Sequence, residues 1–372
     1  MATGETGGIE VLNREYAKKS RLENMHVFFW NGGKIADEMR ALGYSTLELN
    51  ASKLDFSGPL KKMLDFCRKK QPDVIIVHYV APVLYLYALL IRWKYPRIQL
   101  IAYIHESVNP DEKISVSIRN LMKSWIVKCF LNKADYVITI SEFVKKFFIK
   151  KYQLPETKIQ MIYNGVDLSR FCEPLYHSKD VTEMIYVGRL IKEKGVQNIL
   201  RTLAALPQQM DWHLNIVGDG EFRKKLEELT ADWHLESKVD FLGERQDVAG
   251  LLSQSEIFLH LPQWQEGFGI AVVEAMAAGL VCVCAKSGAI AEIISHEEDG
   301  YLIEDLQAEK CAEQLMKIIK EKDCEKVQKL RSAAMEKAKA FSIEVYTNKL
   351  DDFLSKNMTQ EGAEYEGKAA ED

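Results

Sequence analysis

The stretch Gln265-Glu266-Gly267-Phe268-Gly269-Ile270-Ala271-Val272-Val273-Glu274-Ala275-Met276-Ala277 decides how this 372-residue sequence is interpreted. It follows an apolar run and continues into a helical pattern that begins near Gly269. The glycines leave backbone N–H groups at a helix N-terminus open to an anion. Carboxylates beside such a site, here Glu266 and Glu274, are unfavourable unless they contact neutral hydroxyls. We therefore expect this strand-turn-helix segment to contact a sugar as well as an anion.

A second glycine-containing turn carries positive charges. The segment Val187-Gly188-Arg189-Leu190 closes an apolar run at its glycine, and Lys194-Gly195-Val196 follows shortly after. Arginine offers a rigid fork of donors and lysine a mobile charge, and both suit phosphate. We therefore expect Arg189 and Lys194 to complement the turn at Glu266. The alternative is that both are surface charges on a loop, because exposed charges are common and usually have no function.

The sequence has no recognisable metal site. No Asp-x-Asp pair follows a predicted strand, the nearest pattern being Asp219-Gly220-Glu221, and no histidine pair lies at i, i+4 beside a glutamate. We therefore expect neither a metal ion nor another cofactor. The charge of a departing diphosphate would then be balanced by Arg189, Lys194 and the helix N-terminus instead of Mg²⁺.

His105 ends the apolar run Leu100–Ile104 in the first half of the chain. Sheet enzymes keep functional groups at the carboxyl ends of parallel strands, and imidazole titrates near physiological pH. We therefore expect His105 to be functional, whereas His26 and His213 fit packing or surface roles. The sequence contains no Ser-His-Asp arrangement and no G-x-S-x-G turn, so hydrolase nucleophile chemistry is not supported.

Short apolar runs alternate with helical patterns along the whole chain, which predicts α/β architecture with parallel sheets. The predicted strands are 25–30, 45–49, 73–78, 99–105 and 136–141, then 183–188, 213–217, 239–242, 257–261 and 281–285. The predicted helices are 60–70, 83–93, 141–152, 197–205, 221–232, 247–254, 270–278, 290–295 and 308–321. Weak patterning at 172–182 divides the chain, so we expect two Rossmann-like domains that face each other across a deep cleft.

We expect an N-terminal domain at residues 1–172 and a C-terminal domain at 173–341. A helix at 342–356 would pack back on the N-terminal domain, and the acidic tail at 357–372 would be disordered. Gly7-Gly8-Ile9-Glu10 looks like the turn after a first strand, yet few residues precede it. We expect the first strand to be short, missing or trimmed, unless these glycines belong to a floppy N-terminus.

Composition excludes several classes of protein. Hydrophobic residues make up 47% and charged residues 28%, which suits globular domains and not a disordered or fibrous chain. The net charge of −5 argues against general nucleic-acid binding, although the first half is basic and the second acidic. Seven scattered cysteines without a C-x-x-C pattern suit a reducing compartment, and no signal peptide or convincing membrane span is visible. We expect a cytoplasmic protein, soluble or at most peripheral at the membrane.

Taken in order, these motifs resemble the retaining glycosyltransferases of the family four type, which share the GT-B fold. The matching segments are Gly7-Gly8-Ile9-Glu10, Tyr103-Ile104-His105, 134–142, Tyr163-Asn164-Gly165-Val166-Asp167 with Phe171, Val187-Gly188-Arg189, Lys194-Gly195, Val217-Gly218-Asp219-Gly220, and 266–277 with Gly279. They span nearly the whole chain. Two departures are Val281, where the family commonly has proline, and the first strand, which is not found.

The resemblance implies a nucleotide-sugar site in the C-terminal domain and an acceptor site in the N-terminal domain. Arg189 and Lys194 would bind the donor diphosphate, and Glu266 would contact hydroxyls of the transferred sugar. Glu274 would bind the ribose hydroxyls, and His105 matches the family's active-site histidine. The other implied donor-binding residues are Gly8 from the N-terminal domain, Gly188, Gly218, Asp219, Arg245 beside the base, Gly267, Phe268, Gly269 and Ile270.

The implied activity is metal-independent transfer of a hexose-type sugar, with retained anomeric configuration, to a hydroxyl of a glycan or lipid-linked acceptor in polysaccharide or glycoconjugate synthesis. A UDP-sugar is favoured as donor over a GDP-sugar. The departing diphosphate would help to deprotonate the acceptor, with a covalent carboxylate intermediate as the alternative. Other functions left open are a sugar-nucleotide epimerase of the same fold and an inactive sugar-nucleotide-binding protein. A phosphorylase would need a lysine-linked pyridoxal site, which cannot be located.

Basic and aromatic residues alternate in two helical segments of the N-terminal half, 123–133 and 143–151. Such helices can lie on an anionic membrane surface and reach a lipid-linked acceptor. An amphipathic helix with one face in the core and solvated lysines outside has much the same pattern. The sequence leaves both interpretations open.

Overall fold

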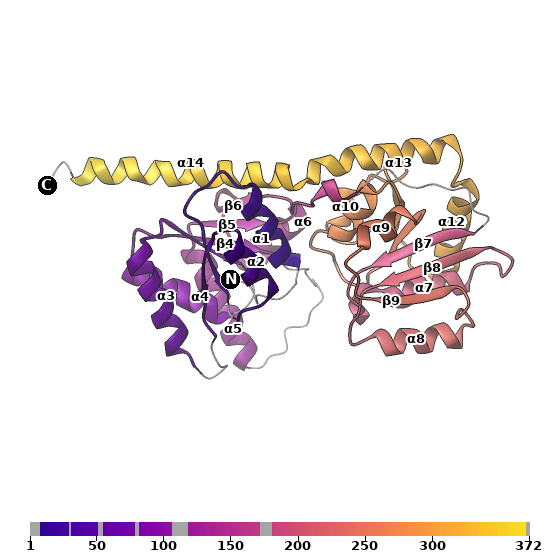
Figure 1. Cartoon of the computed structure of the whole chain (residues 1–372), viewed down its shortest axis with the longest axis horizontal. Coiled ribbons are helices and arrows are strands. Elements are labelled where there is room, and N and C mark those ends of the chain that lie inside the picture. The colour runs from indigo at the N-terminus through magenta and orange to yellow at the C-terminus, as the bar shows by residue number, and fades with distance from the viewer. Residues whose placement is uncertain are drawn as a thin grey trace. The chain divides into compact units, whose positions relative to one another are not determined.

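The computed structural model describes residues 8–29, 31–50, 55–78, 82–105, 118–171 and 181–369. The chain divides into two compact units (Figure 1). The first comprises the described residues up to Gly165 together with those from Ile343 onward, and the second comprises Val166–Ser342. Val166 joins the second unit because its N–H donates to the Phe341 carbonyl at 2.9 Å and it forms a bridge with Ser342. The division therefore lies before the 172/173 boundary expected from the sequence.

Parallel strands form two separate sheets in the first unit. One sheet pairs β1 (His26–Phe29) with β2 (Ser45–Glu48). The other has the order β3 (Val74–His78), β4 (Gln99–Ile104), β5 (Tyr136–Thr139) and β6 (Ile159–Met161). The predicted strands are confirmed, and β6 was missed because three residues are too few to show alternation. The strand expected before Gly8 falls on residues 1–7, which lie outside the described part.

The helices of the first unit flank these sheets. They are α1 (Gly8–Lys19), α2 (Lys34–Ala41), α3 (Ser57–Lys70), α4 (Pro82–Lys94), α5 (Ile118–Lys133), α6 (Glu142–Tyr152), the 3₁₀ turn η1 (Glu156–Lys158) and α14 (Ile343–Ala369). Ser141 caps α6 as predicted, since its hydroxyl accepts from the Val144 N–H at 3.1 Å. Because α6 buries Val144, Phe148 and Tyr152, this segment matches the core-helix interpretation of its lysines.

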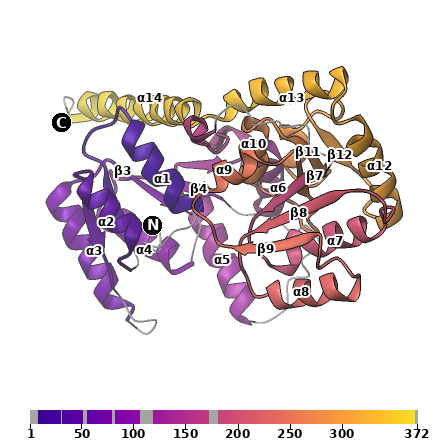
Figure 2. The same cartoon turned by 45° about the vertical axis from the view of Figure 1, so that its right-hand side comes forward.

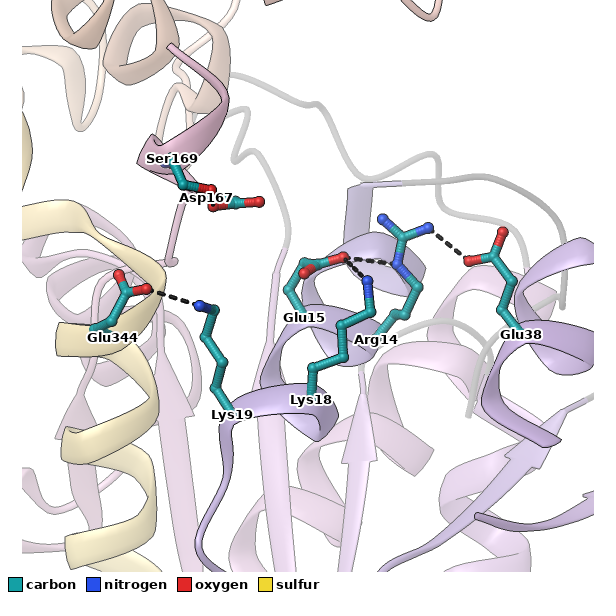
Figure 3. A network of polar contacts seen from close by, with 8 residues as sticks. All are labelled: Arg14, Glu15, Lys18, Lys19, Glu38, Asp167, Ser169 and Glu344. Carbon is teal, nitrogen blue, oxygen red and sulfur yellow. Dashed lines mark hydrogen bonds and ion pairs between the residues drawn. The ribbon is translucent and has the colours of Figure 1, made fainter. Parts of the chain in front are cut away.

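The C-terminal helix α14 packs against α1. Asp351, 1% exposed, accepts hydrogen bonds from the Tyr16 hydroxyl at 2.6 Å and the Ser20 hydroxyl at 2.7 Å. Figure 3 shows an ion pair at the same junction, in which Lys19 Nζ lies 2.8 Å from Glu344 Oε1. The helix continues to Ala369 and so includes part of the tail expected to be disordered. Residues 357–369 include three Glu and two Ala, which are strong helix formers, beside two Gly.

A polar network holds the outer side of α1 (Figure 3). Arg14 lies 2.7 Å from both Glu15 and Glu38, and Lys18 lies 3.0 Å from Glu15. Burial lowers the pKa of the Arg14 guanidinium, but its two carboxylate partners outweigh burial and leave that pKa raised. The network thus links α1 to α2 through charged pairs.

The second unit contains one parallel sheet in its described residues, in the order β12-β11-β10-β7-β8-β9. Its strands are β7 (Thr182–Val187), β8 (Trp212–Val217), β9 (Val239–Gly243), β10 (Ile257–His260), β11 (Val281–Ala285) and β12 (Tyr301–Ile303). The chain leaves β7 toward β8 and β9, and it later returns on the other side of β7 through β10. The strand order therefore reverses between β7 and β10, which is where open α/β sheets bind ligands.

Helices cover both faces of this sheet, with α7 and α8 on one side and α10 and α13 on the other (Figures 1 and 2). The helical elements are η2 (Leu168–Arg170), η3 (Lys192–Lys194), α7 (Val196–Ala204), α8 (Arg223–Asp232), α9 (Val248–Ser253), α10 (Ile270–Ala277), α11 (Ile290–Ile293), α12 (Ala308–Glu321), α13 (Glu325–Ala338) and η4 (Lys339–Phe341). Every residue of β11 is buried, including Cys282 and Cys284, as the apolar run predicted.

Candidate active site

The loops that follow β7 and β10 meet at the point where the strand order reverses. Gly195 has φ +72°, and a Cβ there would lie 1.9 Å from the Leu261 carbonyl oxygen. Only glycine therefore allows the first loop to lie directly on the end of β10. The Gln263 N–H donates to the Glu193 carbonyl at 2.9 Å and the Asn198 amide donates to the Leu261 carbonyl at 3.0 Å. These bonds fix the two loops side by side.

The fixed loops bring Lys194 and Glu266 together. Lys194 Nζ donates to Glu266 Oε1 at 2.8 Å and to Oε2 at 3.1 Å. The Glu266 side chain is 6% exposed and that of Lys194 is 23% exposed. The Glu266 carbonyl also accepts from the Ala289 N–H at 2.9 Å, so the main chain is held as well. Two residues singled out from separate motifs thus form one ion pair, in which the carboxylate is buried and the ammonium group is partly exposed.

His260 is a third member of this cluster, and the sequence analysis missed it. It is the last residue of β10 and 4% exposed, and its Nε2 lies 3.2 Å from Glu266 Oε1. Burial would raise the pKa of Glu266, but His260 and Lys194 outweigh burial and lower that pKa to about 2. A signal was present, because His260 ends a predicted strand just as His105 does.

Glu274 has a different environment from Glu266. It lies on α10, whose N-cap Gly269 adopts φ +117°. Burial raises the pKa of Glu274 to about 7, although the positive charge of Arg170 acts in the opposite direction. Phe268 is 2% exposed and packs edge-on against Phe341, which anchors the turn before the helix. One carboxylate of the motif is therefore firmly ionised, and the other titrates near neutral pH.

The remaining predicted residues of the second unit lie on neighbouring loops. Arg189 is exposed directly after β7 and forms no ion pair with any residue that the structure describes. A Cβ at Gly218 would lie 2.0 Å from the Gly188 carbonyl oxygen, so these two predicted glycines allow the loops after β7 and β8 to touch. Asp219 accepts from the Gly220 N–H at 2.7 Å and lies 3.1 Å from Arg223.

Arg245 is exposed and lies 2.6 Å from Asp247. Arg245 and Asp219 are therefore engaged by partners close in sequence. Within the described ranges neither of them contacts the pair formed by Lys194 and Glu266.

In the first unit His105 pairs with a second histidine. His78 ends β3, and its Nδ1 lies 2.8 Å from His105 Nε2. Tyr103 stacks on both imidazoles, with ring centroids 5.2 Å from His78 and 4.2 Å from His105. Burial lowers the pKa of His105 to about 3 and lowers that of His78 as well. The pair is therefore neutral at pH 7. His78 was overlooked, and Gly8, the other predicted residue of this unit, begins α1.

In the part of the chain that the structure describes, no three side chains of His, Cys, Asp and Glu gather in a way that could hold a metal ion. No helix of the described chain combines the length and apolar character that a membrane crossing requires.

Comparison with known proteins identifies both halves of the chain. Residues 6–170 match the family model "Glycosyltransferase Family 4", and residues 173–340 match "Glycosyl transferases group 1". The N-acetyl-alpha-D-glucosaminyl L-malate synthase of Bacillus anthracis is 27% identical over 277 residues, 70% of this chain and 69% of that protein. An Escherichia coli UDP-Gal:alpha-D-GlcNAc-diphosphoundecaprenol alpha-1,3-galactosyltransferase is 31% identical over 175 residues, 43% of this chain and 45% of that one.

Solved structures of similar fold cover almost the entire chain. HepE of Anabaena, crystallised with UDP and glucose, has a TM-score of 0.80 at 22% identity, and the match covers 95% of this chain and 98% of HepE. WaaG, a glycosyltransferase involved in lipopolysaccharide biosynthesis, has a TM-score of 0.70 at 17% identity, and the match covers 95% of this chain and 98% of WaaG. The resemblance and the fold class inferred from the sequence are confirmed. The chain thus belongs to the group 1, family 4 glycosyltransferases, a retaining family that uses nucleotide sugars, and its two parallel α/β domains have the GT-B fold.

Proposed function

We propose that this chain transfers a hexose from a nucleotide sugar, with retention and without a metal ion, to a hydroxyl of a glycan or a lipid-linked acceptor. UDP is the preferred nucleotide and GDP the second choice. The single observation that carries the proposal is the ion pair of Lys194 and Glu266 between β7 and β10. This pair places a cation suited to phosphate within 2.8 Å of a carboxylate suited to sugar hydroxyls.

Charge at this point of the sheet supports binding of a diphosphate. Lys194 and the exposed Arg189 both lie on the loop that follows β7. The N-terminus of α10 lies at the same edge, and the positive end of a helix dipole favours an anion. A diphosphate bound there would be neutralised by fixed protein charges, as the sequence analysis expected. Glu266 would then face the sugar, and Glu274 the ribose.

The chemical step follows from this arrangement. The bond between the sugar's C1 and the diphosphate oxygen breaks, and C1 forms a bond with the acceptor oxygen on the same face. The acceptor's proton passes to the oxygen of the departing diphosphate. Arg189 and Lys194 stabilise the negative charge that develops on the leaving group, a contribution of about 3–4 kcal/mol for one such donor. His105 would contact the donor sugar as a neutral imidazole.

Exposed apolar side chains on α5 support the proposal that the acceptor is lipid-linked and that the protein binds peripherally at the cytoplasmic face of a membrane. Met122 and Trp125, almost one turn apart, are 60% and 67% exposed. Exposed lysines are found at position 123, between these two residues, and at position 128. Tryptophan beside lysine is typical of helices that lie on an anionic lipid surface. We therefore assign the membrane-facing role to α5, and not to α6.

The test is to measure nucleotide release from UDP-, GDP- and ADP-sugars, with and without glycan and lipid-linked acceptors. We expect release from one nucleotide class that rises when the correct acceptor is added and that is lost in Glu266→Gln. Sugar isomerisation without transfer would identify an epimerase. Binding without turnover for every acceptor would identify an inactive binding protein. The configuration of the new bond, read by NMR, checks retention.

A further inference from the structure

His260 is a buried imidazole for which the proposed mechanism has no use. Its ring centroid is 6.1 Å from that of Phe258 and 6.5 Å from that of Tyr186. Neither ring nitrogen has a hydrogen-bonding partner of good geometry in the described chain, although Nε2 is 3.2 Å from Glu266 Oε1. A buried polar group without a partner costs about 1–3 kcal/mol, so such a group needs a functional explanation.

Lys194 has two tasks that compete. An ammonium group has three N–H donors, and two of them are directed at the two oxygens of Glu266. If Lys194 also binds the donor's diphosphate, as the proposed function requires, at least one of these bonds must be given up. Glu266 would then remain as a carboxylate that is 5% exposed and short of positive charge. Such a group favours the protonated form unless another donor compensates.

We propose that His260 is a positioning residue for Glu266: its Nε2–H group donates a hydrogen bond to the carboxylate when Lys194 turns to the diphosphate. The inference rests on the proposed function for the role of Lys194, but the contact itself is a property of the free protein. No covalent bond changes, and the proton stays on the imidazole. Glu266 is thereby kept ionised and oriented, with its free lone pairs directed to the sugar's hydroxyls.

The other groups around His260 do not supply this donor. The Tyr186 hydroxyl donates to the Arg189 carbonyl at 3.2 Å. Cys284, which lies opposite His260 in the register of β10 and β11, is a buried thiol, and an S–H group is only a weak donor. The guanidinium of Arg189 is exposed and forms no ion pair with Glu266 in the described chain. His260 is the buried donor on the strand next to Glu266.

The test replaces His260 by glutamine or by asparagine, whose side-chain amide nitrogens take the places of different ring nitrogens of the imidazole. His260→Gln places its amide nitrogen close to the position of Nε2, whereas His260→Asn reaches only as far as Nδ1. The substitution Lys194→Met mimics the loss of Lys194 to a diphosphate. We expect His260→Asn to lower the urea midpoint much more in the Lys194→Met protein than in the wild type, and His260→Gln to restore most of that loss. Equal effects in both backgrounds would overturn the proposal.

A binding measurement extends the test to the donor, with UDP-glucose and UDP as probes in calorimetry. We expect His260→Asn to weaken binding of UDP-glucose at least tenfold, while binding of UDP changes less than threefold. Equal weakening of both probes would overturn the proposal. Absence of UDP-glucose binding by the wild type would contradict the proposed donor, whereas the urea experiment would still decide the role of His260. His213→Gln, which changes another histidine beside a carboxylate, is the matched control.

Discussion

Replacement of Lys194 by alanine tests the donor site most directly. The substitution removes the ammonium group whose Nζ lies 2.8 Å from Glu266 Oε1, and it leaves the carboxylate with His260 alone. Two consequences are expected. Turnover should fall about 10²–10³-fold, which is the effect of losing one donor that stabilises developing negative charge. The folded protein should also lose stability at neutral pH, because a buried carboxylate loses its charged partner.

The size of the stability effect follows from the ionisation of Glu266. Burial opposes its ionisation, yet His260 and Lys194 lower its pKa from 4.5 to about 2. At 1.36 kcal/mol per pKa unit this shift corresponds to about 3 kcal/mol of stability, shared between the two partners. Because the folded-state pKa is lowered, the stabilisation is present above pH 4.5 and is lost as the pH falls toward 2. Without Lys194 the pKa should rise, and we expect a loss of about 1–2 kcal/mol at pH 7.

The assay is urea unfolding at pH 7, 5, 4 and 3 for the wild type, Lys194→Ala, Glu266→Gln and the double variant, together with nucleotide release at pH 7. Lys192→Ala is the matched control, since Lys192 is an exposed lysine of the same 3₁₀ turn. We expect the double variant to be more stable than the sum of the single losses. Losses in stability that add within about 0.5 kcal/mol would refute the coupling of the pair. Full turnover in Lys194→Ala would refute the role of Lys194 in the donor site.

Four further outcomes are expected. Donor KM should rise as the pH falls below about 7, because burial raises the pKa of Glu274 to about 7 and its ionised form accepts from ribose hydroxyls more strongly than the protonated acid does. A Glu274→Gln variant should lack that pH dependence, and a retained dependence would contradict the assignment. His78→Leu should lower kcat about tenfold, because it removes one hydrogen bond to His105. His78→Gln should lower kcat less, and equal kcat values in the two variants would remove His78 from the site. Turnover should survive EDTA unchanged, and a strict Mn²⁺ requirement would contradict charge balance by Arg189 and Lys194. Trp125→Glu should reduce cosedimentation with anionic vesicles, but it should not change the release of nucleotide with a soluble acceptor. Unchanged cosedimentation would argue against α5 as the helix that binds the membrane.

The sequence analysis predicted most strands because buried parallel strands are short, continuous apolar runs. It missed β6 and β12, which have only three residues each, and α13, whose many Lys and Glu residues mask the buried positions Val327, Leu330 and Ala334. The tail at 357–372 was expected to be disordered, and the structure describes it as far as Ala369, as the end of α14. Polar composition indicates exposure, but it does not distinguish an exposed helix from a disordered tail.

The local sequence was sufficient to single out Lys194, Glu266 and Glu274, because a glycine-containing turn with charged neighbours can be recognised from the sequence alone. It could not show that Lys194 and Glu266 form an ion pair, since 72 positions separate them and only the reversal of strand order between β7 and β10 brings their loops together. His78 and His260 were overlooked for the same reason. A histidine at the end of a strand acquires a role only from what the adjacent strand or loop places beside it, and the pKa of each buried group depends on that three-dimensional neighbourhood.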